Sequence, residues 1–229
     1  MSTALNTLID TLYASRNSEY AHSMTQYMRG NFPFLGIQAP QRKILQREFL
    51  RIQRVHKFLD WNSIDILYTC DEREFQYVAI DYLRDSIQKI RLEEFSLLEK
   101  YIVWKSWWDS VDILAPLIGR LVQWYPSLEE YIIQHYIPHT NLWIRRVSII
   151  YQLQYKEQTN TEILTQSIIA NQASQEFFIN KAIGWALREY SKHNPIWVDS
   201  FLTQYSEKLH SLSIREARKY INKQKNLDI

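Results

Sequence analysis

Segments of similar helical character recur along this chain at a spacing of about 35 residues. One of them, FQYVAIDYL, begins at Phe75, and comparable segments begin at Pro40, Ser110, Ile144, Ile179 and Ile214. A single helix pair cannot bury its apolar face alone, so copies repeated at a constant period must stack on one another. The spacing therefore predicts an all-α fold, an α-solenoid of about six HEAT-like helix-pair repeats, forming one domain over residues 1–229.

Composition agrees with helices and excludes several functional classes. Only 4 of the 229 residues are glycine and 46% are hydrophobic, which is typical of helical rather than β-rich folds. The lone cysteine, Cys70, excludes an internal disulfide framework, and it follows an apolar run, which favours a buried thiol over a nucleophile. Metal-ligand spacings and glycine-rich nucleotide loops do not occur. We therefore expect an enzyme or binding protein without a metal or other cofactor.

The N-terminal segment does not resemble a secretion signal. It lacks a basic start followed by an apolar run, and no apolar stretch of the chain is long enough to cross a membrane. We expect a cytoplasmic, monomeric protein with no membrane partner. The net charge is only +2, but residues 142–229 carry 12 basic and 8 acidic side chains. An anionic partner is therefore expected to meet the C-terminal part of the chain.

Stacked repeats place equivalent positions on one surface. The third residue of each repeated segment forms such a column, which is mostly polar: Arg42, Tyr77, Asp112, Arg146, Lys181 and Glu216.

The stretch KSWWDSVDILAP, from Lys105 to Pro116, begins a helix with two aspartates in its first turns. Ser106 and Asp109 have the spacing of a capping box, with Ser106 as the N-cap residue, so Asp109 has a structural explanation. Asp112 has none of this kind, because it lies one turn further along the helix.

Helical periodicity separates two faces of this helix. The core face carries Val111, Leu114, Ile118 and Leu121, and the other face carries Trp108, Asp112, Ala115 and Gly119. An indole, a carboxylate and two small residues suit close approach by a ligand. The alternative is a solvated aspartate beside a half-buried tryptophan, and spacing alone does not separate the two.

The segment EFFINKAIGWALREYSK places a second tryptophan among cations. Trp185 shares its helix face with Lys181, Arg188 and Lys192, away from the predicted core. This cluster suits a surface on which cations bind phosphates and the indole contacts a base or sugar. The alternative is an indole that covers a neighbouring helix, with the basic side chains extending around it. We assign the remaining tryptophans to core or inter-repeat packing: Trp61, Trp104, Trp107, Trp124, Trp143 and Trp197.

Five stretches together resemble the DNA alkylation repair glycosylases of the AlkD family. In chain order they are FPFLGIQAPQR, KSWWDSVD, NLWIRR, QLQYK and FFINKAIGWALREY, and the resemblance extends from about Tyr27 to the C-terminal helix. It implies a helical-repeat protein whose concave face holds duplex DNA. It also implies release of cationic alkylpurines, such as 3-methyladenine and 7-methylguanine, in base excision repair.

The resemblance also implies roles for particular residues. The catalytic aspartate of the family corresponds to Asp112, and its two sugar-facing tryptophans correspond to Trp108 and Trp185. Phosphate contacts correspond to Arg146 and Arg188, and residues near the DNA correspond to Tyr27 and Gln38. Two positions depart from the family pattern, because Ala39 replaces a hydroxyl residue and Gln154 replaces a lysine.

The sequence is also compatible with two other functions. The first is a non-catalytic DNA-binding relative, and the second is a HEAT-type scaffold for a protein partner. Retention of Asp112 between two tryptophans disfavours the first, since a carboxylate facing phosphates does not help binding. The cations around Trp185 disfavour the second.

Overall fold

A computed structural model describes residues 2–225, and this part of the chain is helical, with no strand. Fourteen α-helices follow one another within it, joined by loops, three 3₁₀ turns and one π-helical turn. The described chain forms two compact units, which meet in sequence between Lys105 and Ser106. The all-α helical-repeat fold is confirmed, and the single domain stays a prediction.

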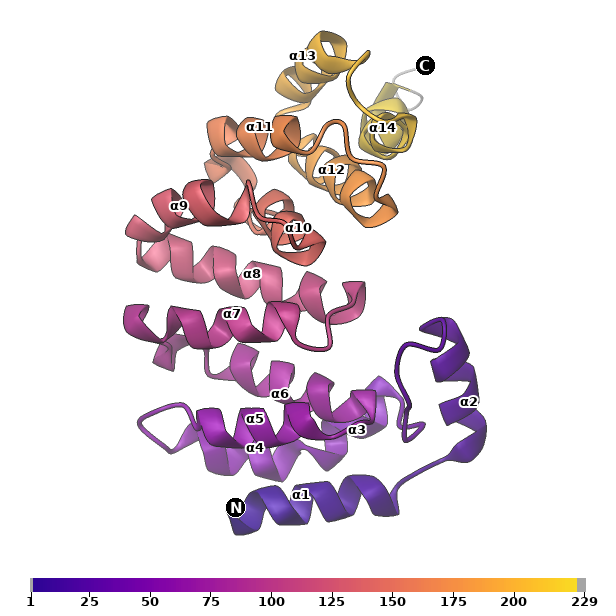
Figure 1. The fold of residues 1–229 in the computed structure, drawn as a ribbon, viewed down its shortest axis with the longest axis vertical. Coiled ribbons are helices and arrows are strands. Elements are labelled where there is room, and N and C mark those ends of the chain that lie inside the picture. Colours follow the sequence, from indigo (N-terminus) through magenta and orange to yellow (C-terminus); the bar gives the residue numbers. More distant parts are fainter. Residues whose placement is uncertain (1, 226–229) are drawn as a thin grey trace. The chain divides into compact units, whose positions relative to one another are not determined.

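The first unit contains seven α-helices (Figure 1). Their bounds are α1 Thr3–Ala14, α2 Ser18–Tyr27, α3 Ala39–Leu45, α4 Arg47–Arg54, α5 Trp61–Thr69, α6 Arg73–Asp85 and α7 Phe95–Val103, with 3₁₀ turns η1 Ile87–Lys89 and η2 Leu92–Glu94 between α6 and α7. Helix α6 packs against both α4 and α5. It supplies much of the core, because Phe75, Val78 and Tyr82 are fully shielded from solvent.

The second unit contains the other seven α-helices. Their bounds are α8 Trp108–Trp124, α9 Ser127–Tyr131, α10 Leu142–Ile150, α11 Thr161–Ala170, α12 Phe177–Tyr190, α13 Pro195–Tyr205 and α14 Ser211–Lys225, with the π-helical turn η3 Ile132–Tyr136 and the 3₁₀ turn η4 Lys156–Gln158. Helix α8 packs against α10, α10 against α12, and α12 against α14 (Figure 1). These four helices contain the repeated segments that begin at Ser110, Ile144, Ile179 and Ile214.

Neighbouring members of the predicted column contact each other within each unit. The contacts join Arg42 to the ring of Tyr77, Asp112 to Arg146, and Lys181 to Glu216. The predicted core stripe of α8 is also buried, since Val111, Leu114 and Ile118 have no exposed surface. The repeat register is therefore confirmed within each unit.

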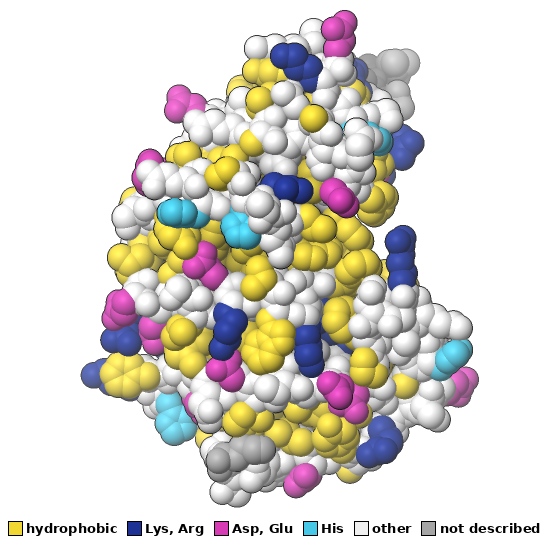
Figure 2. All heavy atoms as spheres, in the orientation of Figure 1, with side chains coloured by type: hydrophobic (Ala, Val, Ile, Leu, Met, Phe, Trp, Pro, Cys, Tyr) yellow, Lys and Arg dark blue, Asp and Glu magenta, His cyan; other side chains and the backbone are white. Residues whose placement is uncertain are grey.

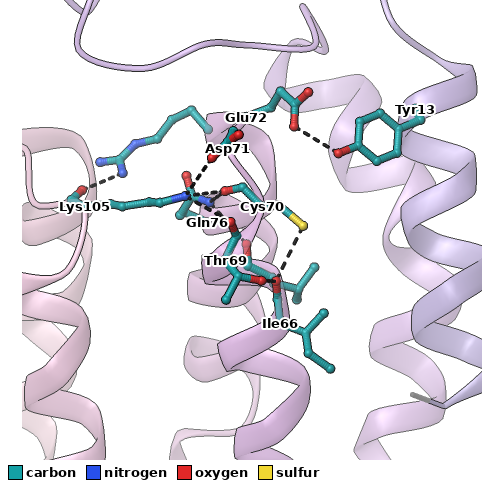
Figure 3. Close-up of polar contacts among 10 residues, drawn as sticks. Tyr13, Ile66, Thr69, Cys70, Asp71, Glu72, Gln76 and Lys105 are labelled. Carbon is teal, nitrogen blue, oxygen red and sulfur yellow. Dashed lines mark hydrogen bonds and ion pairs between the residues drawn. The ribbon is translucent and has the colours of Figure 1, made fainter.

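Cys70 lies in the loop after α5, where donors gather around backbone carbonyls (Figure 3). Its carbonyl oxygen accepts hydrogen bonds from Lys105 Nζ at 2.5 Å and from Gln76 Nε2 at 2.8 Å. Its Sγ atom donates to the carbonyl of Ile66 at 3.5 Å. Burial raises the pKa of the Cys70 thiol, so the thiolate that a nucleophile requires is disfavoured. The half-buried Cys70 fits a packing role.

Within residues 2–225, no helix combines the length and the apolar character that a membrane span requires.

Candidate functional site

A pocket of about 270 Å³ opens on the second unit, and residues of α8, α10, α12 and α14 line it. The lining residues are Trp108, Asp112, Arg146, Phe177, Phe178, Lys181, Trp185, Arg188 and Glu216. The three residues predicted to be catalytic, and three of the predicted phosphate-binding residues, therefore lie in one pocket although they come from three different helices.

Helix α8 positions the first two of these residues. It begins at Trp108, with Trp107 in extended conformation as the N-cap residue. Ser110 Oγ donates to the carbonyl of Trp107 at 3.0 Å and accepts from its backbone N–H at 3.4 Å. Trp108 and Asp112 are one turn apart, so both reach the pocket from one face of the helix. The prediction that Ser106 is the N-cap residue was wrong, because Trp107 occupies that position and the helix begins at Trp108.

Asp112 and Arg146 form a bidentate ion pair across α8 and α10. Each carboxylate oxygen of Asp112 accepts a hydrogen bond of 2.7 Å, one from Nε and one from Nη2 of Arg146. Arg146 also donates to the backbone carbonyl of Phe178 in α12. Its side chain is only 5% exposed, against 17% for Asp112. The carboxylate is therefore held in one orientation at the pocket wall.

The charge of Asp112 is set by two opposing influences. Burial raises the pKa of its carboxyl group, and the hydrogen bonds and charge of Arg146 act against this increase. The nearby carboxylate of Asp109, which is 8% exposed, adds a smaller increase. Arg146 thus favours the ionised form of Asp112, which burial by itself disfavours.

The prediction that Ala115 and Gly119 leave room for a ligand was wrong. Both residues are buried, and a Cβ atom on Gly119 would lie 2.2 Å from the backbone oxygen of Tyr151. Tyr155 also donates a hydrogen bond of 2.6 Å to the carbonyl of Gly119. The small residues therefore permit close packing against the segment that follows α10, because helix packing distances are limited by side-chain size.

Helix α12 presents Trp185 beside Lys181 and Arg188. Both cations line the pocket, and both also pair with Glu216 of α14, at 3.0 Å for Lys181 and 2.7 Å for Arg188. Lys219 of α14 pairs with the same carboxylate at 2.8 Å. Burial opposes the ionisation of Glu216, but these donors prevail and lower its pKa to about 2.

Lys192 does not belong to this cluster as predicted. Helix α12 ends at Tyr190, and Lys192 lies beyond it, where it pairs with Glu189 at 2.6 Å. It is not among the residues that line the pocket. Its contact with DNA stays a prediction.

Tyr27 and Gln38 belong to the first unit. The side chain of Tyr27, at the end of α2, is 71% exposed, and Gln38 is exposed as the N-cap residue of α3. Both are accessible to a large partner, and their roles stay predictions.

An aromatic cluster adjoins the pocket, since one of its members, Phe178, lines it. The ring centroids of Trp107, Trp143 and Phe178 lie 5.0–5.7 Å from one another. Trp107 and Trp143 thus pack between repeats as predicted, and aromatic pairs at these distances add to the stability from burial. Trp124 does not follow the prediction, because it is 41% exposed at the end of α8.

Sequence reasoning missed three pocket residues: Phe177, Phe178 and Glu216. Glu216 had a detectable signal, since it stood in the polar column one repeat after Lys181. The two phenylalanines, which begin α12, had no such signal, because the sequence pattern does not distinguish them from core residues.

Charged side chains of both signs are interspersed on the face drawn in Figure 2. This agrees with the small net charge of the sequence. Local clusters, rather than the charge of the whole molecule, would therefore attract an anionic partner. Among the described residues, no group of three or more His, Cys, Asp and Glu side chains could hold a metal ion.

Comparisons with known proteins agree on one family. A sequence model of the family described as "DNA alkylation repair enzyme" matches residues 8–221. A solved structure described as a predicted DNA alkylation repair enzyme from Enterococcus faecalis is 38% identical, covers 90% of this chain and 96% of its own, and superposes with a TM-score of 0.84. No curated protein matches the chain. By sequence and fold together, the chain belongs to the family of DNA alkylation repair enzymes.

Proposed function

We propose that this protein is a DNA glycosylase that hydrolyses the N-glycosidic bond of cationic alkylpurines in duplex DNA, as a step of base excision repair. The proposed substrates are 3-methyladenine and 7-methylguanine. The observation that carries the proposal is the oriented carboxylate of Asp112, which lines one open pocket together with the indoles of Trp108 and Trp185.

The chemistry of the leaving group explains why one carboxylate suffices. An alkylated purine carries a positive charge, so the electron pair of the breaking C1′–N bond neutralises the departing base. Protonation of the leaving group is therefore unnecessary, whereas ordinary glycosidases use a second carboxyl group for it. In the proposed mechanism Asp112 acts as an ionised carboxylate, and no general acid is needed.

The deoxyribose requires the main stabilisation. It becomes an oxocarbenium-like cation as the base departs, and the Asp112 carboxylate faces this charge. At a separation of about 4 Å and an effective dielectric constant near 20, the attraction is on the order of 4 kcal/mol before desolvation. The indoles of Trp108 and Trp185 each add about 0.5–2 kcal/mol through their faces. A water molecule oriented by Asp112 then adds to C1′ and releases its proton to solvent.

We assign Arg146 a role other than the predicted phosphate contact. Its guanidinium is buried and engaged by Asp112 and by the carbonyl of Phe178. In the proposal it orients the carboxylate and maintains its charge. Lys181 and Arg188 bind phosphates at the pocket, and Tyr27, Gln38 and Lys192 contact the duplex elsewhere, with the protein acting as a monomer.

The direct test is single-turnover base release from a duplex that contains one 7-methylguanine. We expect an abasic site at the lesion, detected as alkali-induced strand cleavage on a gel. A protein that binds this duplex but leaves the base in place would support the non-catalytic relative instead. A protein that does neither would support the scaffold.

A further inference from the structure

One buried carboxylate gathers three cations at the edge of the pocket. The side chain of Glu216 is 7% exposed, and it pairs with Lys181, Arg188 and Lys219 at 2.7–3.0 Å. The cations remain accessible, since 39%, 28% and 53% of their side chains are exposed, respectively. The cluster therefore carries an excess of two positive charges, and its cations face solvent.

Neutralisation of charge does not explain this arrangement. Where the chain neutralises a lysine nearby, it uses one carboxylate for one cation, as in the pair of Glu189 and Lys192. Glu216 instead fixes the mutual positions of three cations and leaves most of their charge uncompensated. Fixed cations lose less side-chain entropy on binding an anion than free ones do.

Close packing of α12 on α14 places the Glu216 carboxylate beside Lys181 and Arg188. A Cβ atom on Gly184 would lie 2.5 Å from Cβ of Glu216 and 2.8 Å from the backbone oxygen of Ser213. Ser213 Oγ also donates a hydrogen bond of 2.9 Å to the carbonyl of Asn180. The absence of a side chain at Gly184 thus lets α14 approach α12 closely enough for Glu216 to reach Lys181 and Arg188.

We infer that Glu216 is a positioning residue that organises Lys181, Arg188 and Lys219 into a subsite for backbone phosphodiester groups of the duplex. The inference rests on the proposed function and deepens it, because it assigns Glu216 and Lys219 to binding. Lys181 and Arg188 line the pocket beside Trp185, so the subsite holds a phosphate next to the sugar that contacts this indole. The low pKa of Glu216 keeps the carboxylate ionised at neutral pH, so the cations stay in place before DNA binds.

The test compares two variants that gain the same charge. Glu216→Gln and Glu189→Gln each remove one negative charge, but only Glu216 holds three cations. Their affinities for an undamaged duplex are measured over a range of salt concentrations. We expect Glu216→Gln to bind about five- to tenfold more weakly than wild type at low salt, with the slope of log K against log salt smaller by about 1, the value for one lost phosphate contact. Glu189→Gln should bind as tightly as wild type or slightly more tightly.

The opposite result has a clear meaning. If Glu216 only neutralises cations, Glu216→Gln will bind more tightly than wild type, and the inference is overturned. Thermal unfolding confirms that the variants are folded at the assay temperature. Lys219→Gln provides a second variant at an exposed position, and it should also lower the slope by about 1. An unchanged slope for Lys219→Gln would likewise overturn the subsite.

Base release separates this inference from the proposed function. If wild type excises 7-methylguanine and Glu216→Gln binds more tightly, the subsite fails while the glycosylase proposal stands. If wild type binds duplex in the manner described here but excises no alkylpurine, the glycosylase proposal fails while the phosphate subsite stands.

Discussion

Asp112 and Arg146 are 34 positions apart in sequence, yet both carboxylate oxygens of Asp112 accept 2.7 Å hydrogen bonds from the Arg146 guanidinium. The planar fork of an arginine fixes the plane of a carboxylate as well as its charge. Asp112 therefore presents a defined orientation to the pocket. A lysine at position 146 would supply charge without this constraint.

Asp112→Asn preserves the shape of the side chain and removes its charge. If the carboxylate supplies about 3–4 kcal/mol to the transition state, single-turnover base release should fall about 100- to 1000-fold. Binding of undamaged duplex should hold or improve, because an anion near phosphates is lost. The control is Asp109→Asn, which should cost about 1 kcal/mol of stability in the first turn of α8 and leave excision nearly intact. Loss of excision in the control alone would place the catalytic charge on Asp109.

Arg146→Gln should shift the acidic limb of the pH profile. In the proposed mechanism base release requires the ionised carboxylate, so the rate should decline as the pH falls through the pKa of Asp112. Burial raises that pKa and Arg146 lowers it, so loss of Arg146 should move the decline to higher pH. Single-turnover rates measured between pH 4 and 8 test this shift, and Arg145→Gln serves as a control on the same helix. A uniform loss of rate with an unmoved limb would contradict the assigned role.

Arg188→Gln should weaken all duplexes alike. Phosphate contacts carry no base information, so affinity for damaged and undamaged duplexes should fall by similar factors. Wild-type binding should itself weaken at least tenfold between about 50 and 200 mM salt if a few phosphates are neutralised. Fluorescence anisotropy on both duplexes measures these effects. A selective change in lesion preference would show that Arg188 contacts the base.

Gly119→Ala should destabilise the second unit without altering the pocket. The added Cβ atom would meet the backbone of Tyr151, and overpacking of this kind costs about 1–3 kcal/mol. Thermal unfolding should show the loss, and base release by the folded fraction should stay close to wild type. If Gly119→Ala keeps full stability but loses excision, the original prediction that Gly119 lies against a ligand would be supported instead.

Glu216 should make folding sensitive to acid. Its pKa is lowered from 4.5 to about 2 in the folded state, so its contribution to stability is complete above pH 4.5 and is lost as the pH falls towards 2. Glu216→Gln should therefore lower the melting temperature at pH 7 and flatten its decline between pH 4.5 and 2. Glu48→Gln is the control, because its pair with Arg51 is exposed and should contribute little. Parallel declines for wild type and Glu216→Gln would contradict this assignment.

The helices, their repeat and, within each unit, the column of equivalent positions could all be predicted from the sequence. These features depend on spacing along the chain, because an apolar period near 3.6 residues selects a helix face and a period near 35 residues selects stacked pairs. The position of Trp108 one turn before Asp112, and of Trp185 near Lys181 and Arg188, follows from the same local periodicity. The packing of α8, α10 and α12 then brings the predicted catalytic residues into one pocket.

Two features depend on how the helices pack: which polar groups pair, and which small residues lie against a neighbouring backbone. From the sequence alone, Arg146 could bind either a phosphate or Asp112. In the structure α8 and α10 lie close enough for Arg146 to pair with Asp112. The closeness of Tyr151 to Gly119, and of Glu216 to Gly184, likewise depends on how neighbouring helices approach. Partners of this kind are separated by about one repeat, and their contact is fixed by the combined packing of many side chains, so no local pattern in the sequence encodes it.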